Sequence, residues 1–189
     1  MSEKHVPGTM MPLSDISGGM FSIFCPMIEA ADGLSLGQVC AITGLEYSTV
    51  QNWVKRGFVD RPIKKKYYER HLSRILIINA LRDSMKIDSI AELLERVNGS
   101  VYDESDDIIP EGKLYDYLCE VIRGMDMTRD TEEEAQRIIA EVTADYTGPS
   151  SDSRHVLTTA LMAMTFAYLS GRLKTEAELY FARLKEGNV

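Results

Sequence analysis

Residues 48 to 68 are the part of the sequence whose residue types and spacing are best suited to chemistry on another molecule. Ser, Thr, Gln and Asn precede a run of Lys and Arg, and no nucleophile-elbow or phosphate-binding glycine motif accompanies them. Amide and guanidinium groups pair with base edges, and ammonium groups neutralise phosphates. The combination favours binding to duplex DNA over catalysis. The candidate residues are Ser48, Thr49, Gln51, Asn52, Lys55, Arg56, Arg61, Lys64, Lys65, Lys66, Tyr67 and Tyr68.

The candidates divide by the contact that each is expected to make. Gln51, Asn52 and Arg56 are expected to read base edges, because Gln or Asn pairs with adenine and Arg with guanine. A second group is expected to contact phosphates: Arg61, Lys64, Lys65, Lys66 and a hydroxyl from Tyr67 or Tyr68. If about six phosphates are neutralised, affinity should fall about a thousandfold between about 50 and 200 mM salt.

Charge is distributed unevenly along the chain. The formal net charge of −8, taken alone, argues against a nucleic-acid partner. Residues 34 to 97, however, hold 11 Lys and Arg against 7 Asp and Glu, whereas residues 98 to 189 hold 9 against 18. The two parts are therefore expected to face different partners, with a basic patch within residues 47 to 74 of the first that includes Arg70 and Arg74.

Helix signals precede the lysine run. Two Ser-x-x-Gln pairs, beginning at Ser35 and Ser48, are each predicted to form a capping box, and Gly44 and Gly57 supply the left-handed conformation that ends a helix. Two helices joined by a tight turn result. The segment after them is long enough only for a small hairpin, which would form a wing beside the second helix.

The order of helix, glycine turn, helix, basic wing and two further helices resembles the DNA-binding domain of the MerR family. The resemblance rests on Leu36 to Gly44, Thr49 to Trp53, Gly57-Phe58, Pro62, Lys65-x-Tyr67, Leu72-x-x-Ile75-x-x-Ile78 and Ile87 to Leu94. It implies a winged helix-turn-helix with a small β wing, whose second helix enters the major groove. The chain also resembles an uncharacterised bacterial family that joins such a half to a helical tail.

The predicted fold class is all-α, with the winged helix-turn-helix followed by an acidic helical bundle. Four segments are expected: an N-terminal arm at 1–33, the DNA-binding domain at 34–97, an acidic linker at 98–112, and a sensing or assembly bundle at 113–189. Four helices are expected in the bundle. The inward-facing residues of the last are predicted to be Ala177, Tyr180, Phe181 and Leu184.

Several classes of function are disfavoured. Cys25, Cys40 and Cys119 are odd in number and form no CxxC pair, which argues against disulfides or structural zinc and favours the reducing cytoplasm. The apolar stretch Val156 to Leu169 is too short to cross a bilayer, so no membrane partner is expected. No catalytic residue, metal or cofactor is predicted.

The leading prediction is a sequence-specific, duplex-DNA-binding transcription regulator. Two alternatives keep the helix-turn-helix in a structural role: a protein-interaction module, or an accessory factor of the excisionase type that bends DNA. Homodimer formation, and a protein or small-molecule effector at the C-terminal bundle, are left open by the sequence.

Overall fold

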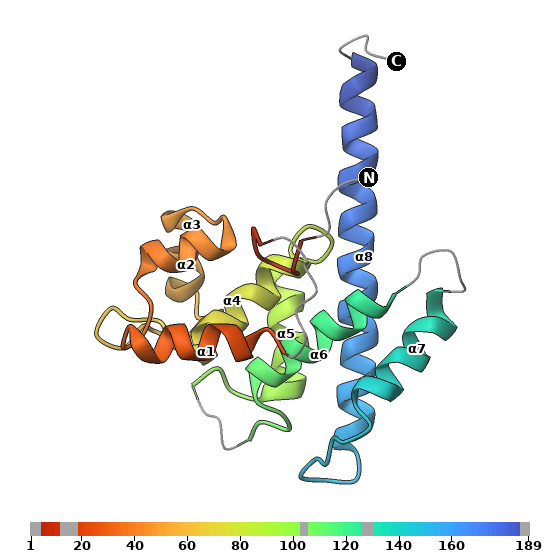
Figure 1. Ribbon diagram of the computed structural model, residues 1–189, viewed down its shortest axis with the longest axis horizontal. Coiled ribbons are helices and arrows are strands. Elements are labelled where there is room, and N and C mark those ends of the chain that lie inside the picture. Colours follow the sequence, from red (N-terminus) through yellow and green to blue (C-terminus); the bar gives the residue numbers. More distant parts are fainter. Residues whose placement is uncertain (1–4, 12–18, 103–105, 126–130, 186–189) are drawn as a thin grey trace.

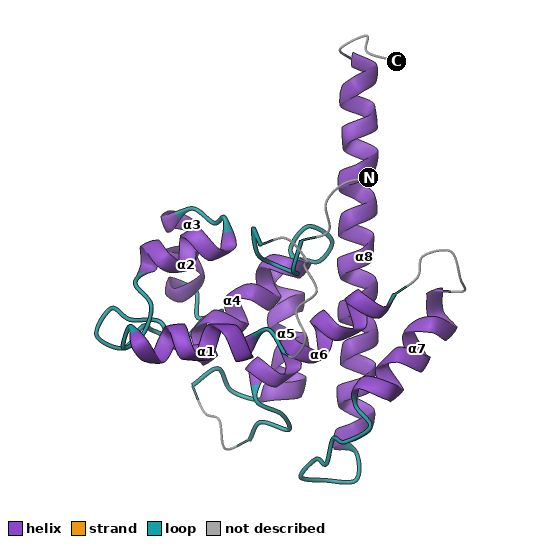
Figure 2. Cartoon of the chain, in the orientation of Figure 1, coloured by secondary structure: helices purple, strands orange, loops and turns teal. Residues whose placement is uncertain are grey.

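The computed structural model describes residues 5–11, 19–102, 106–125 and 131–185, and in these ranges the regular secondary structure is helical (Figures 1 and 2). The predicted all-α class is confirmed. The helices are α1 (Phe21–Ala30), α2 (Leu36–Thr43), α3 (Tyr47–Lys55), α4 (Glu69–Leu81), α5 (Ile87–Asn98), α6 (Glu111–Gly124), α7 (Thr131–Val142) and α8 (Ser153–Lys185).

The expected pair of short helices forms as α2 and α3. The Ser35 hydroxyl accepts the Gln38 N–H at 3.3 Å, and the Gln38 side-chain oxygen accepts the Ser35 N–H at 2.8 Å, which confirms the first capping box. Gly44 ends α2 with φ 70°, as predicted. The second capping box was predicted wrongly, because α3 begins at Tyr47 with Glu46 as its N-cap and no side-chain cap.

The wing, residues 58–68, is a tight turn. The described part of this segment contains isolated bridges, Ile63 to Lys66 and Leu34 to Tyr67, and no strand. Lys64 and Lys65, with φ of 49° and 66°, close the turn between the first bridged pair. Pro62 has no backbone N–H to donate next to this turn. Tyr67 pairs with Leu34, which lies just before α2, so the strand pairing of the expected hairpin does not continue beyond Ile63 and Lys66.

Helix α4 is the centre of the core. Leu72, Ile75, Leu76, Ile77 and Ile78 are completely buried, so the middle of this helix is enclosed on every side by the rest of the fold. It packs against α1, α2, α5, α6 and α8. The helix-turn-helix on one side and the C-terminal helices on the other are therefore held by one shared element.

The first described helix belongs to the predicted arm and is packed into the same core. Phe21 and Phe24 are buried, and α1 lies against α4 and α6. Buried side chains form one continuous cluster from α1 to α8, across the predicted linker. The four-segment division of the chain stays a prediction. Residues 1–4 and 12–18 of the arm, and 103–105 of the linker, lie outside the described residues.

Helix α8 differs most from expectation. One continuous helix of 33 residues replaces the two that were predicted, and its end extends beyond the other helices (Figure 1). Gly171 does not break it, because this glycine packs against Asp83 and Ser84 and is followed by strong helix formers. The prediction that Ala177, Tyr180, Phe181 and Leu184 face inward was wrong, since all four are exposed.

Helix α8 is also the single described helix that is long and apolar enough, by composition, to cross a membrane. Its most apolar window is 44% buried within the fold, and the core helix of a soluble protein passes the same test. This is weak evidence for a membrane span.

Candidate nucleic-acid interface

Helix α3 presents a polar face opposite its buried one. Val50 and Trp53 are buried, and Trp53 is the core anchor that its position predicts. Spacings of three, one and three residues place the exposed side chains on a single face, with Thr49 half-buried at its edge. The exposed residues of this face are Ser48, Gln51, Asn52 and Lys55. Two amides and one ammonium group are thus presented on one helical surface.

Arg56 lies at the end of α3 and has partners within the chain. Its guanidinium is 3.4 Å from an Asp88 carboxylate oxygen and 4.4 Å from the centre of the Phe58 ring. Both carboxylate and guanidinium are exposed, and such pairs contribute little to stability. The pair therefore orients Arg56 without preventing its exchange onto another acceptor.

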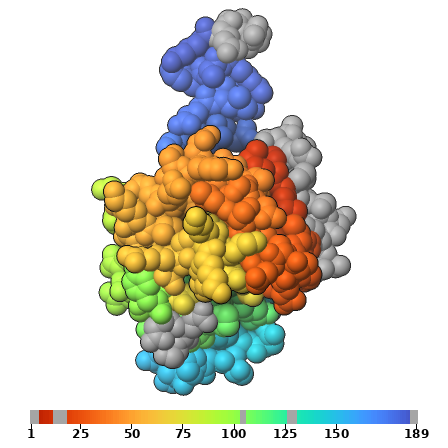
Figure 3. All heavy atoms as spheres, turned by 90° about the vertical axis from the view of Figure 1, so that its left-hand side faces the viewer, coloured from red at the N-terminus to blue at the C-terminus, as the bar shows by residue number. Residues whose placement is uncertain are grey.

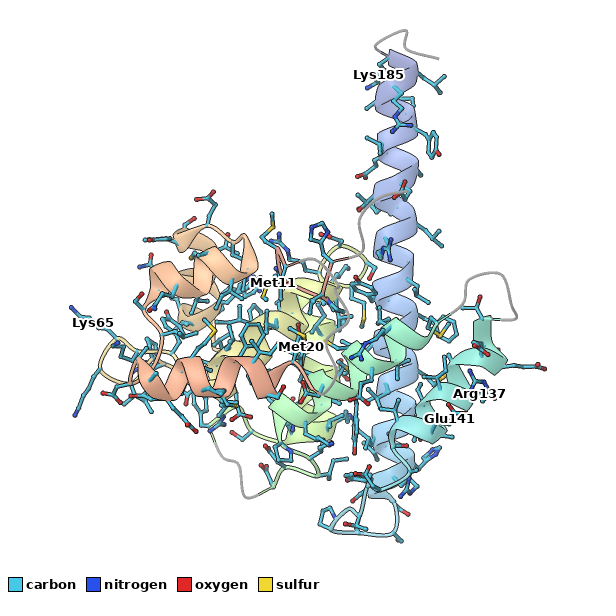
Figure 4. The ribbon with its side chains drawn as sticks, in the orientation of Figure 1. Met11, Met20, Lys65, Arg137, Glu141 and Lys185 are labelled. Atoms are coloured by element: carbon cyan, nitrogen blue, oxygen red, sulfur yellow. The ribbon has the colours of Figure 1, made fainter. Side chains whose placement is uncertain are left out.

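The tip of the wing carries two lysines away from the body of the protein. Lys64 and Lys65 are exposed, and Figure 4 shows Lys65 at the outer edge of the molecule. In Figure 3 the wing (yellow) and the α2–α3 pair (orange) are adjacent on one face. Arg61, also exposed, lies on the same segment. The exposed polar and basic residues of α3 and the wing, from Ser48 to Lys65, are together called the α3–wing face below, and the exposed apolar Ile63 lies among them.

Three of the residues predicted to contact phosphates lie away from this face. Lys66 donates to the carbonyls of Ala31 and Gly33 at 2.9 and 3.0 Å, and Tyr67 is 4% exposed and hydrogen bonded through its backbone to Leu34. The half-buried Tyr68 donates its hydroxyl to Asp32. Burial raises the pKa of both Tyr67 and Tyr68. These side chains hold the wing in place.

Two further arginines of the predicted basic patch are also used internally. Arg70 donates to backbone carbonyls of Ser100 and Val101, and Arg74 is buried with Glu111. The lysine and arginine run of the sequence therefore overstates the exposed positive charge. Five of the predicted contact residues carry exposed cationic groups: Lys55, Arg56, Arg61, Lys64 and Lys65.

His71, which the sequence analysis did not select, connects the two ends of the wing. Its Nδ1 accepts the Tyr68 N–H at 3.1 Å, so the other ring nitrogen carries the proton and donates to the Arg61 carbonyl at 3.1 Å. The ring is buried and packs edge-on against Tyr67. A lone histidine in a helix gives no signal of this role, because both partners are backbone groups.

Replacing His71 with Ala is expected to lower the free energy of unfolding by about 1–3 kcal/mol, since it leaves two partly buried backbone groups without a partner. Urea unfolding followed by circular dichroism measures this. His5→Ala, at an exposed side chain, is the matched control and should change stability by less than about 0.5 kcal/mol. Equal stability of the two variants would contradict the proposed role of His71 in holding the two ends of the wing together.

Tyr47 is a second residue that the sequence did not select. Its side chain is 56% exposed at the start of α3, beside the polar face. Because the helix was expected to begin at Ser48, this residue was expected to precede the helix. An exposed tyrosine presents both a ring and a hydroxyl, and it enlarges the α3–wing face.

No group of three or more His, Cys, Asp and Glu side chains able to hold a metal ion occurs in the described part of the chain. A concave site near the wing has a volume of about 450 Å³ and lies between Glu69, Arg70, Asp107 and Glu111. Burial and the nearby Glu111 raise the pKa of Asp107 to about 6. This acidic hollow is poorly suited to a phosphate and is not part of the α3–wing face.

Comparisons with known proteins match the part of the chain that contains this face. Residues 34–118 match the family model described as "Domain of unknown function (DUF1836)". "Uncharacterized protein YkrK" of Bacillus subtilis (strain 168) is 28% identical over 117 residues, 58% of this chain. The match spans 50% of that relative's length. No solved structure matches the chain.

The matched family segment extends beyond the helix-turn-helix. It begins at residue 34, continues through α5 and the predicted linker, and ends within α6. Helix α6 packs closely on α4, which explains why a unit that contains α4 would include it. Neither the family nor the Bacillus subtilis relative is described with an activity, and the likeness to the MerR family stays a prediction.

Proposed function

We propose that the chain is a sequence-specific regulator that binds duplex DNA through the α3–wing face, with a MerR-like arrangement of helix-turn-helix and wing. Helix α3 enters the major groove, and Gln51, Asn52 and Arg56 read base edges. Arg61, Lys64 and Lys65 contact flanking phosphates. The role of Lys66, Tyr67 and Tyr68 is to fix the wing.

The observation that carries this proposal is the division of α3 into two faces. The apolar face is anchored by Val50 and Trp53, while the exposed face contains only polar and basic side chains from Ser48 to Lys55. A helix that served only to fill the core would have no need to present two adjacent amides beside a basic turn. The oxygen and nitrogen of a single side-chain amide match the donor and acceptor that adenine presents in the major groove, so each of these residues can pair with one adenine.

The alternative in which the helix-turn-helix has only a structural role has one observation in its favour. Lys66 folds back onto the carbonyls of Ala31 and Gly33, as a purely structural lysine would. Its neighbours Lys64 and Lys65 are exposed, and within the part of the chain that the structure describes neither ammonium group makes a hydrogen bond or an ion pair. Two of the three lysines therefore favour an external partner of negative charge.

Selection from a pool of random-sequence duplexes tests base readout directly. The wild-type protein is expected to enrich a defined motif. Replacing Gln51 and Asn52 with Ala should remove the preference for adenine at the positions that they read, at about 1–3 kcal/mol for each lost paired contact, while leaving affinity for random duplex nearly unchanged. Gln136→Ala, at an exposed amide on α7, is the control and should enrich the same motif. Enrichment by the double variant equal to wild type would contradict the assignment.

A further inference from the structure

Helix α8 exposes a stripe of side chains spaced alternately three and four residues apart. Its large members are Phe166, Leu173 and Tyr180, which are 36%, 60% and 62% exposed. Three small members alternate with them along the helix and are also exposed: Ala163, Ser170 and Ala177. Alternating spacing of three and four keeps a seam on one side of a helix and is the pattern by which one helix packs along another.

The alternation of size favours one direction of pairing. In an antiparallel pair the two kinds of seam position face each other, so every large side chain meets a small one and the layers interdigitate. In a parallel pair large would meet large and small would meet small, which crowds some layers and leaves gaps in others. Two copies of the seam therefore fit each other best when the helices run in opposite directions.

We propose that two copies of this chain pair antiparallel along α8. Ala163 then faces Tyr180 of the second copy, Ser170 faces Leu173, and Ala177 faces Phe166. By the twofold symmetry each contact occurs twice. From residue 159 to residue 184 the paired region is about 38 Å long at 1.5 Å per residue.

A groove at the base of α8 fits this register. It has a volume of about 330 Å³ and an apolar lining that includes Leu93 of α5 together with Ala160 and Ala163 of α8. The proposed pairing brings Tyr180, Phe181 and Leu184 of the second copy to this level. The exposed aromatic residues near the end of α8 therefore fit the groove near the start of α8 in a second copy, which they cannot reach within their own chain.

Charged residues beside the seam disfavour one neighbouring register. A shift by one heptad towards the C-terminus would place Lys174 against Lys174 and Glu176 against Glu176, which like-charge repulsion disfavours. The proposed register avoids both clashes.

A lipid bilayer fits the exposed end of α8 less well than a second copy does. Lys174, Glu176, Glu178 and Arg183 surround this end of the helix, and its large apolar residues other than Leu179 lie on one side. A seam of this kind is suited to a helical partner, whereas a span is apolar all round. The inference concerns assembly and does not depend on DNA binding.

Sedimentation equilibrium of the full chain tests the pairing. Wild type is expected to be a dimer. Leu173→Glu, in the seam, should raise the dimer dissociation constant at least about tenfold, because it would bury an unpaired charge. Leu179→Glu is the matched control, since Leu179 lies on the same helix, is 44% exposed and falls outside the seam. A monomeric wild type, or a dimer that Leu173→Glu leaves intact, would overturn the proposal.

Disulfide trapping tests the direction. A mixture of Ala163→Cys and Tyr180→Cys proteins should form crosslinked heterodimers under mild oxidation, while neither protein alone should crosslink above the background of wild type with its native cysteines. Efficient crosslinking of Ala163→Cys with itself would show parallel pairing and overturn the register. Flotation of a monomeric wild-type protein with phosphatidylglycerol and phosphatidylethanolamine vesicles would assign the stripe to a membrane and overturn the dimer.

Discussion

Replacing Arg74 with Met is expected to lower the free energy of unfolding by about 3–5 kcal/mol. The Arg74 and Glu111 side chains are 7% and 4% exposed and form an ion pair between α4 and α6. Removing the guanidinium leaves a carboxylate in the core opposite a thioether, and the loss of its cationic partner dominates the cost. Denaturant unfolding followed by circular dichroism at pH 7 gives the value.

The double variant Arg74→Met/Glu111→Leu separates the ion pair from mere loss of packing. Replacing both partners with apolar groups of similar size removes the desolvation cost together with the attraction, so the double variant should recover most of the lost stability. A double variant no more stable than Arg74→Met alone would contradict this. The pair also joins the helix-turn-helix side of the molecule to α6, so unfolding of wild type should be a single transition across both.

Reversing the charge of Lys64 and Lys65 is expected to reduce the affinity for duplex DNA on the order of 100-fold at about 0.1 M salt. Two phosphate contacts are lost, and the slope of log affinity against log salt should decrease by about 1.8. Because Glu and Lys face similar strain at positive φ, the turn itself should persist. Fluorescence anisotropy with a labelled duplex across a salt series measures both quantities.

The matched control is Lys113→Glu/Lys185→Glu. Lys113 and Lys185 are exposed and lie on α6 and α8, so this variant changes the net charge by the same amount outside the α3–wing face. Its salt slope should equal that of wild type. An equal loss of affinity in the two double variants would mean that overall charge, and not the wing, governs binding.

Local signals in the sequence predicted the bounds of α2 well. Ser35 and Gly44 mark these bounds because their capping interactions involve residues only three or four positions away. The N-cap of α3 was predicted two residues too late, at Ser48 in place of Glu46, because a capping pattern in the sequence does not fix the end of a helix to the residue.

Non-local contacts explain what the sequence could not predict. A run of lysines looks uniform, yet Lys66 bonds to carbonyls more than thirty residues earlier, while Lys64 and Lys65 point outward. Arg74 was counted in the basic patch because its partner Glu111 is distant in sequence. The outer half of α8 was assigned to the core because helical periodicity identifies an apolar side but does not reveal whether anything covers it.

The salt dependence of duplex binding by the wild-type protein tests the central claim most directly. The three cationic residues assigned to phosphates, Arg61, Lys64 and Lys65, predict a slope of about −2.7, so that affinity falls about 40-fold between about 50 and 200 mM salt. A folded protein that shows no duplex binding at about 50 mM salt, or binding with a slope near zero, would contradict the proposed function.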